Sequence, residues 1–522
     1  MFTPLTPIRC LYRAVDLYGN KEAVVCGEHR FTYAQFGERC ERLAAALQAA
    51  GVGGRDRVAY LSFNTHKLLE GYFGVVMAGA IVMPLNVRLT PAELTAILQH
   101  AGARMLFFED EFSHLIPAIR AACPKLETVV SLEHGYESFL AGAEPQRIDI
   151  YNIAENSVAE LFYTSGSTGT PKGVMLSHRS LYLHALSVSS IFTQNDTSVQ
   201  LHTIPLFHAN GWGCPQATTI MGAKHVMVRR FDPVTVFRLI EAERATSMLL
   251  VPTMANALLN SPALTQYDLS SLKEIHFGGA ASTPDLVSRM EKAFHCDCRA
   301  GYGLTETAPV LTDSRLKSTL PAMSDPDRHT RLAMAGWPIL GVEVRVVDPQ
   351  MNDVPKDFAS IGEIVARGDH IMEGYFDDAA ATEAVMTGGW FHTGDMAVWD
   401  TENYVHIVDR KKDIIISGGE NISSLEVEKC IGLHPDVLEC AVVSAPDTKW
   451  GEIPVAFVQL KPGSQIEASH LFEHLAPLLA RFKMPRQFEF VTEPLPKTGT
   501  GKILKRELRE RFWTGRDLRV QG

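Results

Sequence analysis

The sequence predicts an α/β protein in which sheets are layered with helices, followed by a smaller α+β unit at the C-terminal end. Two observations support this class. Helix-like and strand-like segments alternate along most of the chain. The pattern changes near residue 409, where a run of charged residues separates two apolar strand-like segments. The chain has 522 residues, of which 46% are hydrophobic and 21% charged, as is usual for globular proteins.

The first clear helix is predicted after Thr32, which forms a capping box with Gln35. Apolar side chains then recur on one face and Gly51 can close the helix, the apolar positions being Phe36, Cys40, Leu43 and Leu47. A strand is predicted at 58–61. The same helix-then-strand order recurs at 68–83, 91–108 and 234–251, where 248–251 resembles a buried strand. Alternating units of this kind predict sheets covered by helices.

The charged run spans 409–413, between strand-like segments at 404–408 and 414–416. A compact unit follows it. Ser423 and Glu426 predict a capping box that opens a helix. Strands at 440–443 and 454–460, a helix over 468–481 and a basic tail complete the unit. About 110 residues suffice for a small domain, so we place a boundary at 409–412, between domains 1–408 and 413–522.

Composition excludes several classes of protein. The 49 basic and 60 acidic residues give a formal net charge of −11, which disfavours nucleic acid or anionic lipid as the main partner. Nine cysteines lack the paired spacing of a disulfide framework, which favours a reducing cytoplasm. The cluster 295–298 contains His295, Cys296 and Cys298, but no second cluster at zinc-site spacing accompanies it, so we do not expect a structural metal there.

Two apolar patterns bear on membranes. The N-terminal segment lacks the apolar stretch of a secretory signal. The most apolar run, 72–85, is too short and too interrupted by Gly74, Gly79 and Pro84 to span a bilayer. No integral membrane segment is therefore expected, and peripheral membrane contact is left open.

A glycine- and hydroxyl-rich loop at 163–173 lies directly behind the apolar strand-like run 158–162. Glycines let backbone N–H groups approach a phosphate, hydroxyls add donors, and Lys172 adds a positive charge. A Walker A loop needs glycine before its lysine and Ser or Thr after it. Pro171 and Gly173 occupy those positions, so the loop predicts phosphate binding of another kind, with a plain surface turn as the alternative.

Four further segments accompany this loop, each weak by itself. They are Gly301-Tyr-Gly-Leu-Thr-Glu-Thr307, Trp390-Phe-His-Thr-Gly-Asp395, Ser417-Gly-Gly-Glu-Asn421 and Pro496-Lys-Thr-Gly-Thr-Gly-Lys502. In this order and spacing, and over essentially the whole length, the chain resembles an adenylate-forming acyl-CoA synthetase, of the superfamily shared with luciferases and peptide-synthetase adenylation domains. The resemblance implies a large N-terminal domain of several sheet-and-helix subdomains and a small, mobile α+β C-terminal domain.

The resemblance also implies two half-reactions. A carboxylate first attacks the α-phosphate of ATP, giving acyl-AMP and pyrophosphate, and the thiol of coenzyme A (CoA) then gives a thioester and AMP. Tyr302 would stack on adenine, with Gly303 next to it and Gly278, Gly279 and Ala280 beside it. Thr305 would donate to the α-phosphate, and Glu306 would hold Mg²⁺. The residues of the phosphate loop would be Thr164, Ser165, Gly166, Ser167, Thr168, Gly169 and Lys172.

The same resemblance assigns residues nearer the C-terminus. Asp395 and Arg410 would bind the ribose hydroxyls, and Lys412 would be the hinge residue. Gly418 and Gly419 would approach the pantetheine arm of CoA, where a Cβ would block the tunnel. Lys502 would carry adenylation by bridging the carboxylate and the α-phosphate, two anions that repel each other. Lys505 stands where relatives often carry Arg, which leaves that assignment unchanged.

The segment 207–212, Phe-His-Ala-Asn-Gly-Trp, resembles the acyl-tunnel segment of fatty-acyl members, with His208 beside the reacting carboxylate and Trp212 as a gate. The implied lining is apolar: Ala209, Trp212, Gly278, Gly303, Pro309 and Val310. No cationic residue in the segment would pair with a charged substrate. A medium- or long-chain fatty acid is therefore expected, with aryl and methylthioalkanoate acids as alternatives.

Three rival functions stay open at this point. A luciferase-like monooxygenase would oxidise a luciferin, and a stand-alone adenylation enzyme would load a carrier protein. A non-enzymatic nucleotide-binding protein would tolerate loss of Lys502 or Glu306, and both are present. The expected small-molecule partners are the acid, ATP, Mg²⁺ and CoA, and a homodimer is expected from relatives of the fatty-acyl type.

Overall fold

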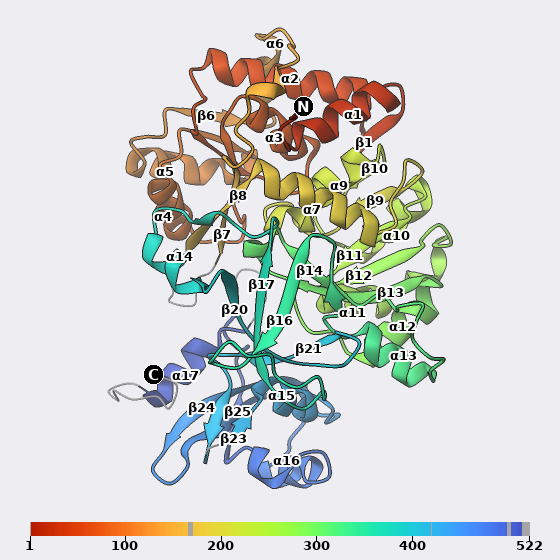
Figure 1. Ribbon diagram of the computed structural model, residues 1–522, viewed down its shortest axis with the longest axis vertical. Coiled ribbons are helices and arrows are strands. Elements are labelled where there is room, and N and C mark those ends of the chain that lie inside the picture. The colour runs from red at the N-terminus through yellow and green to blue at the C-terminus, as the bar shows by residue number, and fades with distance from the viewer. Residues whose placement is uncertain (1, 165–170, 419, 498–502, 514–522) are drawn as a thin grey trace. The chain divides into compact units, whose positions relative to one another are not determined.

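The computed structural model describes residues 2–164, 171–418, 420–497 and 503–513, and it is a mixed α/β protein (Figure 1). The chain divides into two compact units. Unit 1 comprises Met1–Val344, Ala366–Phe391 and Asn403–Val405, and unit 2 comprises Arg345–Val365, His392–Glu402 and His406–Gly522. The predicted class, with a large and a smaller part, is confirmed. The boundary at 409–412 stays a prediction.

The first sheet of unit 1 has the strand order β15-β14-β13-β12-β11-β9-β10-β1-β2. Its central strands, from β13 to β1, are parallel, whereas β2, β14 and β15 pair antiparallel at the two edges. The strands are β1 (Glu22–Cys26), β2 (His29–Thr32), β9 (Val199–His202), β10 (Lys224–Met227), β11 (Ser247–Leu250), β12 (Glu274–Phe277), β13 (Asp297–Gly303), β14 (Val310–Asp313) and β15 (Trp337–Pro338).

The second sheet of unit 1 has the order β18-β8-β7-β4-β3-β5-β6. Strands from β7 to β6 are parallel, and β8 joins antiparallel to both β7 and β18. The strands are β3 (Arg57–Leu61), β4 (Ile81–Pro84), β5 (Met105–Phe108), β6 (Thr128–Ser131), β7 (Val158–Thr164), β8 (Lys172–Ser177) and β18 (Gly374–Tyr375).

Helices cover both sheets. Side chains from α10 and α12 pack on the first sheet, and α4 and α5 pack on the second (Figure 1). The helices of unit 1 are α1 (Ile8–Tyr18), α2 (Tyr33–Ala49), α3 (His66–Met77), α4 (Pro91–Ala101), α5 (Ile116–Ala122), α6 (Tyr136–Ala141), α7 (His178–Ile191), α8 (Ala209–Trp212), α9 (Cys214–Ile220), α10 (Pro233–Glu243), α11 (Pro252–Leu259), α12 (Pro284–Phe294), α13 (Asp325–Leu332) and α14 (Ala379–Val385).

Helix α3 explains the most apolar run of the sequence. It contacts β1 of the first sheet and β3, β4 and β7 of the second, and it is buried over nearly its whole length. A helix that is apolar all round requires such burial. Strand β4, which follows it, is also buried. The run 72–85 is therefore core.

Unit 2 contains a sheet of order β23-β22-β25-β24 with β26 beside β25. Its elements are β22 (Ile415–Ser417), β23 (Glu420–Ile422), α15 (Ser424–Gly432), β24 (Val437–Asp447), β25 (Gly451–Leu460), α16 (Ala468–Leu475), β26 (Gln487–Val491) and α17 (Lys505–Trp513). A further sheet has the order β16-β17-β20-β19, with β21 beside β20. Its strands are β16 (Val342–Val347), β17 (Gly362–Gly368), β19 (Met386–Thr387), β20 (Trp390–Trp399) and β21 (Val405–Arg410).

Most elements expected from the sequence are present, although several bounds differ; the strand expected at 440–443, for example, extends over Val437–Asp447. The capping box of Thr32 and Gln35 is complete. At α15 the Ser423 side chain caps the helix, but the carboxylate of Glu426 contacts Lys483 instead of closing the box. The helix predicted over 468–481 ends at Leu475, because Pro477 cannot continue it. The strand expected at 248–251 ends at Leu250, and Val251 precedes α11.

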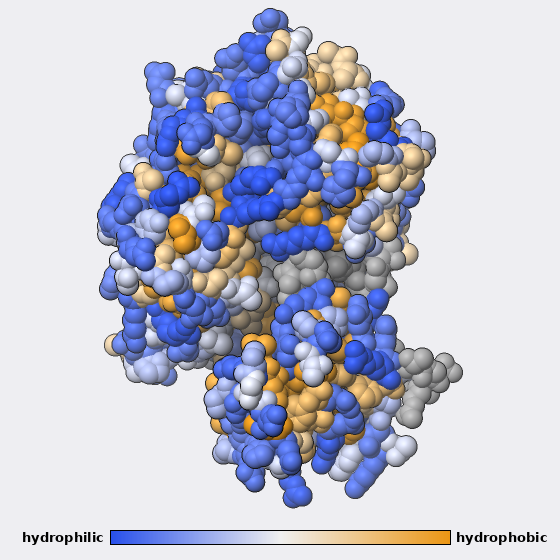
Figure 2. Space-filling view, turned by 180° about the vertical axis from the view of Figure 1, so that it is seen from behind, coloured by the Kyte–Doolittle hydropathy of each residue, from blue (hydrophilic) through white to orange (hydrophobic). Residues whose placement is uncertain are grey.

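Apolar side chains also reach the surface of unit 2. Figure 2 shows apolar patches there, and the large exposed side chains include Leu433, Leu438, Leu478 and Phe490. They come from several elements of this unit and lie outside its core cluster.

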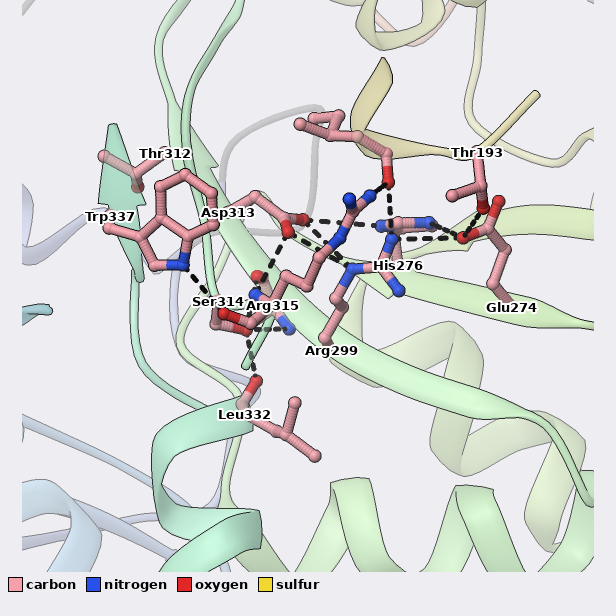
Figure 3. Close-up of polar contacts among 12 residues, drawn as sticks. Thr193, Glu274, His276, Arg299, Thr312, Asp313, Ser314, Arg315, Leu332 and Trp337 are labelled. Atoms are coloured by element: carbon pink, nitrogen blue, oxygen red, sulfur yellow. Dashed lines mark hydrogen bonds and ion pairs between the residues drawn. The ribbon is translucent and has the colours of Figure 1, made fainter. Parts of the chain in front are cut away.

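A buried polar network ties together the strands at the β13 end of the first sheet (Figure 3). The guanidinium of Arg299 on β13 lies 3.0 Å from Glu274 on β12 and 3.2 Å from Asp313 on β14, and it donates to the Ile191 carbonyl at the end of α7. His276 lies 3.2 Å from Glu274. Burial alone would raise the pKa of Glu274 and Asp313, but His276 and Arg299 outweigh it and lower both pKa values.

Replacing Arg299 with Met should destabilise unit 1 by about 3–5 kcal/mol, because Glu274 and Asp313 would stay buried without their cation. Arg147→Met removes an exposed ion pair with Asp16 and should cost less than about 1 kcal/mol. Urea unfolding of both variants measures the difference. Equal stability of the two variants would contradict the role given to Arg299.

Candidate active site

The phosphate loop predicted from the sequence lies between two paired strands. Strand β7 leads into it and β8 leads out, and Thr164 is the cross-strand partner of Lys172. Ser165, Gly166, Ser167, Thr168 and Gly169 lie outside the described residues. The hairpin therefore fixes the two ends of the predicted loop at the edge of the second sheet.

Tyr375 connects Lys172 to Glu306. The ammonium of Lys172 lies 4.6 Å from the centre of the Tyr375 ring, and the Tyr375 hydroxyl donates to a Glu306 carboxylate oxygen at 2.9 Å. The Met372 N–H also donates to the Glu306 carbonyl, at 2.8 Å. Burial, together with the nearby Glu306 carboxylate, raises the pKa of Tyr375, so the phenol keeps its proton and donates. Three separate segments thus bring a cation and a carboxylate into one cluster.

The segment 301–307 lies at the turn between β13 and β14. Gly303 is required there, because a Cβ would approach the Pro309 carbonyl oxygen to 1.7 Å. The Thr307 hydroxyl accepts from the Leu304 N–H at 3.0 Å and donates to the Pro309 carbonyl. Thr305 is buried and Tyr302 half-buried. The Arg299 network anchors both strands of this hairpin, so it fixes where the segment leaves the sheet.

The predicted acyl segment adopts an unusual backbone. Five consecutive residues have positive φ: Ala209 (45°), Asn210 (42°), Gly211 (55°), Trp212 (60°) and Gly213 (80°). Glycine adopts this region freely and Asn tolerates it, but Ala and Trp each pay roughly 1–2 kcal/mol. The left-handed turn 209–213 therefore needs support from its surroundings.

Buried amide and carboxyl groups provide that support. The Asn210 side-chain oxygen accepts from the Gly213 N–H at 2.5 Å, and its amide donates to Glu160 on β7 at 3.3 Å. Gln216 on α9 donates to the other Glu160 oxygen at 2.6 Å. Glu160 is fully buried, and among the described residues it forms no ion pair. Burial raises the pKa of Glu160 to about 8, against the lowering effect of these two hydrogen bonds.

Several residues of the predicted acyl lining come together. Ala209, Trp212 and Val310 belong to one apolar cluster, with Leu249 and Ile339 among its members. The Trp212 ring lies against Gly278, where a Cβ would approach it to 2.8 Å, and close to Gly279, whose φ is +73°. Ala280 is exposed at the same turn, and Pro309 is buried beside Val310. The turn after β12 thus gives Trp212 room.

His184 on α7 supports the same region from another side. Its Nε2 accepts from the Val310 N–H at 3.0 Å, and its ring lies against Gly213, where a Cβ would clash at 2.4 Å. Burial lowers the pKa of His184 well below its ordinary value, so the ring is neutral and can accept. His208, the predicted neighbour of the substrate carboxylate, is half-buried, and its backbone N–H donates to the Pro205 carbonyl.

In unit 2 the two residues predicted to bind the ribose form an ion pair. Asp395 on β20 is buried and lies 2.7 Å from Arg410 at the end of β21. Glu363 on β17 supports both strands: its carboxylate accepts from the Gly394 N–H and lies 3.0 Å from Lys411 and 3.1 Å from His392. Burial would raise the pKa of Glu363, but His392 and Lys411 lower it.

The predicted hinge and CoA residues are partly described. The Lys412 carbonyl accepts from Arg509 on α17 at 2.7 Å, and the same guanidinium lies 2.8 Å from Asp413. Gly418 has φ of +61°, and a Cβ there would approach the Trp450 ring to 2.7 Å. Gly419 and Lys502 lie outside the described residues.

Sequence reasoning missed several residues of these clusters, among them Glu160, Tyr375 and Glu363. Glu160 carried a signal, since an acid stands in the middle of the apolar run 158–162. Tyr375 follows a glycine in an otherwise ordinary segment, and Glu363 has no local pattern at all. Both acquire partners that are distant in sequence, which spacing cannot reveal.

The described residues, 2–164, 171–418, 420–497 and 503–513, contain no candidate metal-binding cluster and no candidate membrane-spanning helix. Within these ranges no three His, Cys, Asp or Glu side chains gather as a metal-binding group. Among the helices formed by the same residues, none is long and apolar enough to cross a membrane.

Comparisons with known proteins cover almost the whole chain. A family model described as AMP-binding enzyme matches residues 11–376, and one described as AMP-binding enzyme C-terminal domain matches 426–502. A long-chain-fatty-acid–CoA ligase of Thermus thermophilus is 40% identical, over 96% of this chain and 94% of the relative. A feruloyl-CoA synthase of Amycolatopsis is 39% identical, over 94% and 96%. A crystal structure of an anthranilate CoA ligase with anthranoyl-AMP has a TM-score of 0.87 at 27% identity, covering 98% of both chains.

The raised pKa of Glu160 gives a pH-dependent prediction. Between the unfolded carboxyl pKa of about 4.3 and the folded value of about 8, only the folded state holds the proton. Stability should therefore fall as pH rises through this window, by at most about 1.4 kcal/mol per pH unit, and Glu160→Gln should remove that slope.

Unfolding measured from pH 4 to 8 tests this. Glu274→Gln is the control, because the Glu274 pKa is lowered. Its stabilisation is present above the unfolded carboxyl pKa of about 4.3 and is lost only as pH falls below that value, so above about pH 5 this variant should keep the wild-type slope. Parallel pH profiles for wild type and Glu160→Gln would show that Glu160 does not hold a proton in the folded state.

Proposed function

Because the chain belongs to the AMP-binding enzyme family, we propose that it is an ATP-dependent acid:CoA ligase that forms acyl-AMP and then acyl-CoA from an apolar carboxylic acid. The similarity to CoA ligases over almost the entire chain supports this, as does the likeness to a structure that holds an acyl-AMP. It is an AMP-forming enzyme with ATP and CoA as co-substrates.

The cluster of Lys172, Tyr375 and Glu306 carries the adenylation part of the proposal. A nucleoside triphosphate needs a cation against its terminal phosphates and Mg²⁺ across its oxygens. Lys172 follows the loop that would wrap the phosphates, and Glu306 presents a carboxylate, the ligand type that Mg²⁺ prefers. Since Mg²⁺ in such sites takes one or two carboxylates plus phosphate oxygens and water, a single Glu306 fits it. Bound there, Mg²⁺ would neutralise charge on the phosphates.

Tyr375 holds Glu306 and Lys172 in this cluster through its hydroxyl and its ring. Its hydrogen bond occupies one Glu306 oxygen and leaves the other free to face a metal, while its ring face attracts the Lys172 ammonium. Thr305, adjacent to Glu306, would donate to the α-phosphate. Tyr302, on the same hairpin, would stack on adenine beside Gly279 and Ala280.

Asp395 and Arg410 would bind the ribose. Asp395 is buried, and its carboxylate is oriented by Arg410 at 2.7 Å. Glu363 holds the backbone on both sides of that pair through Gly394 and Lys411. A buried, preoriented carboxylate is well suited to accept two hydroxyl groups.

Lys502 would carry the first half-reaction and Gly418 and Gly419 the second. Lys502 would bridge the attacking carboxylate and the α-phosphate, whose charge grows in the transition state. Near Gly418 the exposed Trp450 ring has Lys449 4.8 Å and Arg486 5.9 Å from its centre. An aromatic face beside two cations suits the nucleotide end of CoA. Lys412 would be the hinge about which the C-terminal domain rotates between the two half-reactions.

The apolar cluster around Trp212 supports an uncharged apolar acid. We favour medium- or long-chain fatty acids, with His208 beside the carboxylate. Aryl acids are the second candidate, since the feruloyl-CoA synthase is nearly as similar as the fatty-acid ligase. Methylthioalkanoates would fit the same apolar walls.

Compartment and assembly are two further proposals. All nine cysteines are free, which supports a reducing compartment such as the cytoplasm. A homodimer rests on the resemblance to fatty-acyl members, and sedimentation at several concentrations measures it.

The proposal is tested by incubating the enzyme with ATP, Mg²⁺, CoA and a panel of short, medium, long, aryl and methylthioalkanoate acids. We expect acyl-CoA, AMP and pyrophosphate in equal amounts. Acyl-AMP transferred only to a carrier protein would favour the carrier-loading alternative. Oxygen consumption with an oxidised product would favour the monooxygenase.

Lys502→Ala should slow acid-dependent pyrophosphate release about a hundredfold to a thousandfold, because a preorganised charge donor is lost at the transition state. Supplied acyl-AMP should still react with CoA at close to the normal rate. Single-turnover assays of each half-reaction measure both rates. Arg506→Ala, which removes an exposed pair with Glu510 in the same basic tail, is the control. Equal loss of both half-reactions would contradict separate roles.

Asp395→Ala should weaken ATP binding by roughly 1–3 kcal/mol, since the ribose hydroxyls would lose a buried acceptor. KM for the acid should change much less. Glu343→Ala, which removes an exposed pair with Arg367, is the matched control. Normal ATP affinity in a folded Asp395→Ala enzyme would exclude the ribose assignment.

A further inference from the structure

The left-handed turn 209–213 has one fully buried acid behind it. Glu160 lies on β7, four residues before Thr164, and accepts from both Asn210 and Gln216. Its neighbours along the strand, Leu161 and Tyr163, belong to the core that includes α4. Because side chains alternate along a strand, Glu160 points to the opposite face. The same strand therefore leads into the phosphate loop and supports the acyl segment.

The turn cannot hold its shape through its own backbone preferences. Ala209 and Trp212 have φ of 45° and 60°, which L-residues rarely adopt. Asn210 ties the turn together by accepting from the Gly213 N–H, and the orientation of its amide is fixed because its nitrogen donates to Glu160. Gln216 holds the second Glu160 oxygen, so the carboxyl group cannot rotate away.

A purely structural acid would have a simpler arrangement available. Glu70, which is also fully buried, is neutralised by Arg39 at 2.6 Å and accepts from the Tyr136 hydroxyl at 2.7 Å. The carboxyl group of Glu160 instead accepts hydrogen bonds from two side-chain amides, and both belong to the acyl segment or to the helix that follows it. An apolar residue at 160 would satisfy the core and leave the turn unsupported.

We propose that Glu160 is a specificity-determining positioning residue, which holds the left-handed turn through Asn210 and Gln216 and so sets how long an apolar acid can enter past Trp212. This inference rests on the proposed acid:CoA ligase function. Glu160 would shape the acyl site without touching the acid itself. The Trp212 ring packs directly against Gly278, where a Cβ would approach it to 2.8 Å.

The test compares kcat/KM for butanoate, octanoate, dodecanoate and hexadecanoate in wild type and five variants. In Glu160→Ala the ratio between short and long acids should shift about tenfold, the scale of one or two methylene groups of fit. KM for ATP should stay within about twofold of wild type, since an apolar-pocket change leaves nucleotide contacts alone. Glu160→Gln keeps the size of the side chain and one acceptor oxygen. Its new NH2 group can donate to the Gln216 side-chain oxygen, which has no partner among the described residues, once that amide turns. This variant should therefore keep the wild-type ratio.

Asn210→Gly provides a second route if Glu160→Ala does not fold. Glycine accepts the positive φ but cannot reach Glu160, so it should shift the ratio in the same direction. The double variant should shift it no further than either single change, because both remove one link. Glu70→Gln is the matched control: it perturbs a buried acid away from the turn and should lower stability with the ratio unchanged.

Three results would overturn the inference. Glu160→Ala with an unchanged ratio, an equal loss for all four acids, or a shift of the same size in Glu70→Gln would each show that Glu160 serves stability alone. Failure of the proposed function is a separate outcome, since wild type would then form no thioester from any acid.

Discussion

The buried guanidinium of Arg299 is the contact on which the hairpin of β13 and β14, and with it the proposed nucleotide site of unit 1, depends. It joins β12, β13 and β14 through Glu274 and Asp313, and reaches the end of α7 through the Ile191 carbonyl. Charges buried to this degree are tolerated only when paired. The network therefore fixes the antiparallel hairpin whose turn carries Tyr302, Thr305 and Glu306, and the proposed nucleotide contacts depend on that fixed exit from the sheet.

The same design recurs behind each candidate cluster. A polar side chain hydrogen-bonds to the residue that would meet a substrate, or to the backbone beside it. Tyr375 donates to Glu306, and Glu363 accepts from the N–H of Gly394, the residue before Asp395. Glu160 stands in the same way behind the turn that carries Trp212. In the last case the support also offsets backbone strain, because Ala209 and Trp212 are held in a left-handed conformation. Strain of this kind persists only where surrounding contacts determine the geometry.

Local patterns in the sequence were sufficient for the fold class, for the helix opened by Thr32, and for the five motifs in their order. Such features depend on capping, periodicity and glycine positions, which act over a few residues. One error also has a local cause, because Pro477 ends α16 earlier than the predicted helix over 468–481. Glu363, Tyr375 and the role of Glu160 were missed because their partners lie far away in the chain. A buried acid inside an apolar run was the one visible sign.

The central claim is that the carboxylate of the acid attacks the α-phosphate of ATP. It is tested most directly with an acid labelled in both carboxylate oxygens with oxygen-18, by mass spectrometry of the AMP formed in a complete reaction with CoA. An acyl-adenylate requires that one labelled oxygen bridges carbon and phosphorus, so each AMP should carry one label after the thiol displaces it. Unlabelled AMP accompanied by acyl-CoA would show that the acid never bonded to the α-phosphate and would contradict the account.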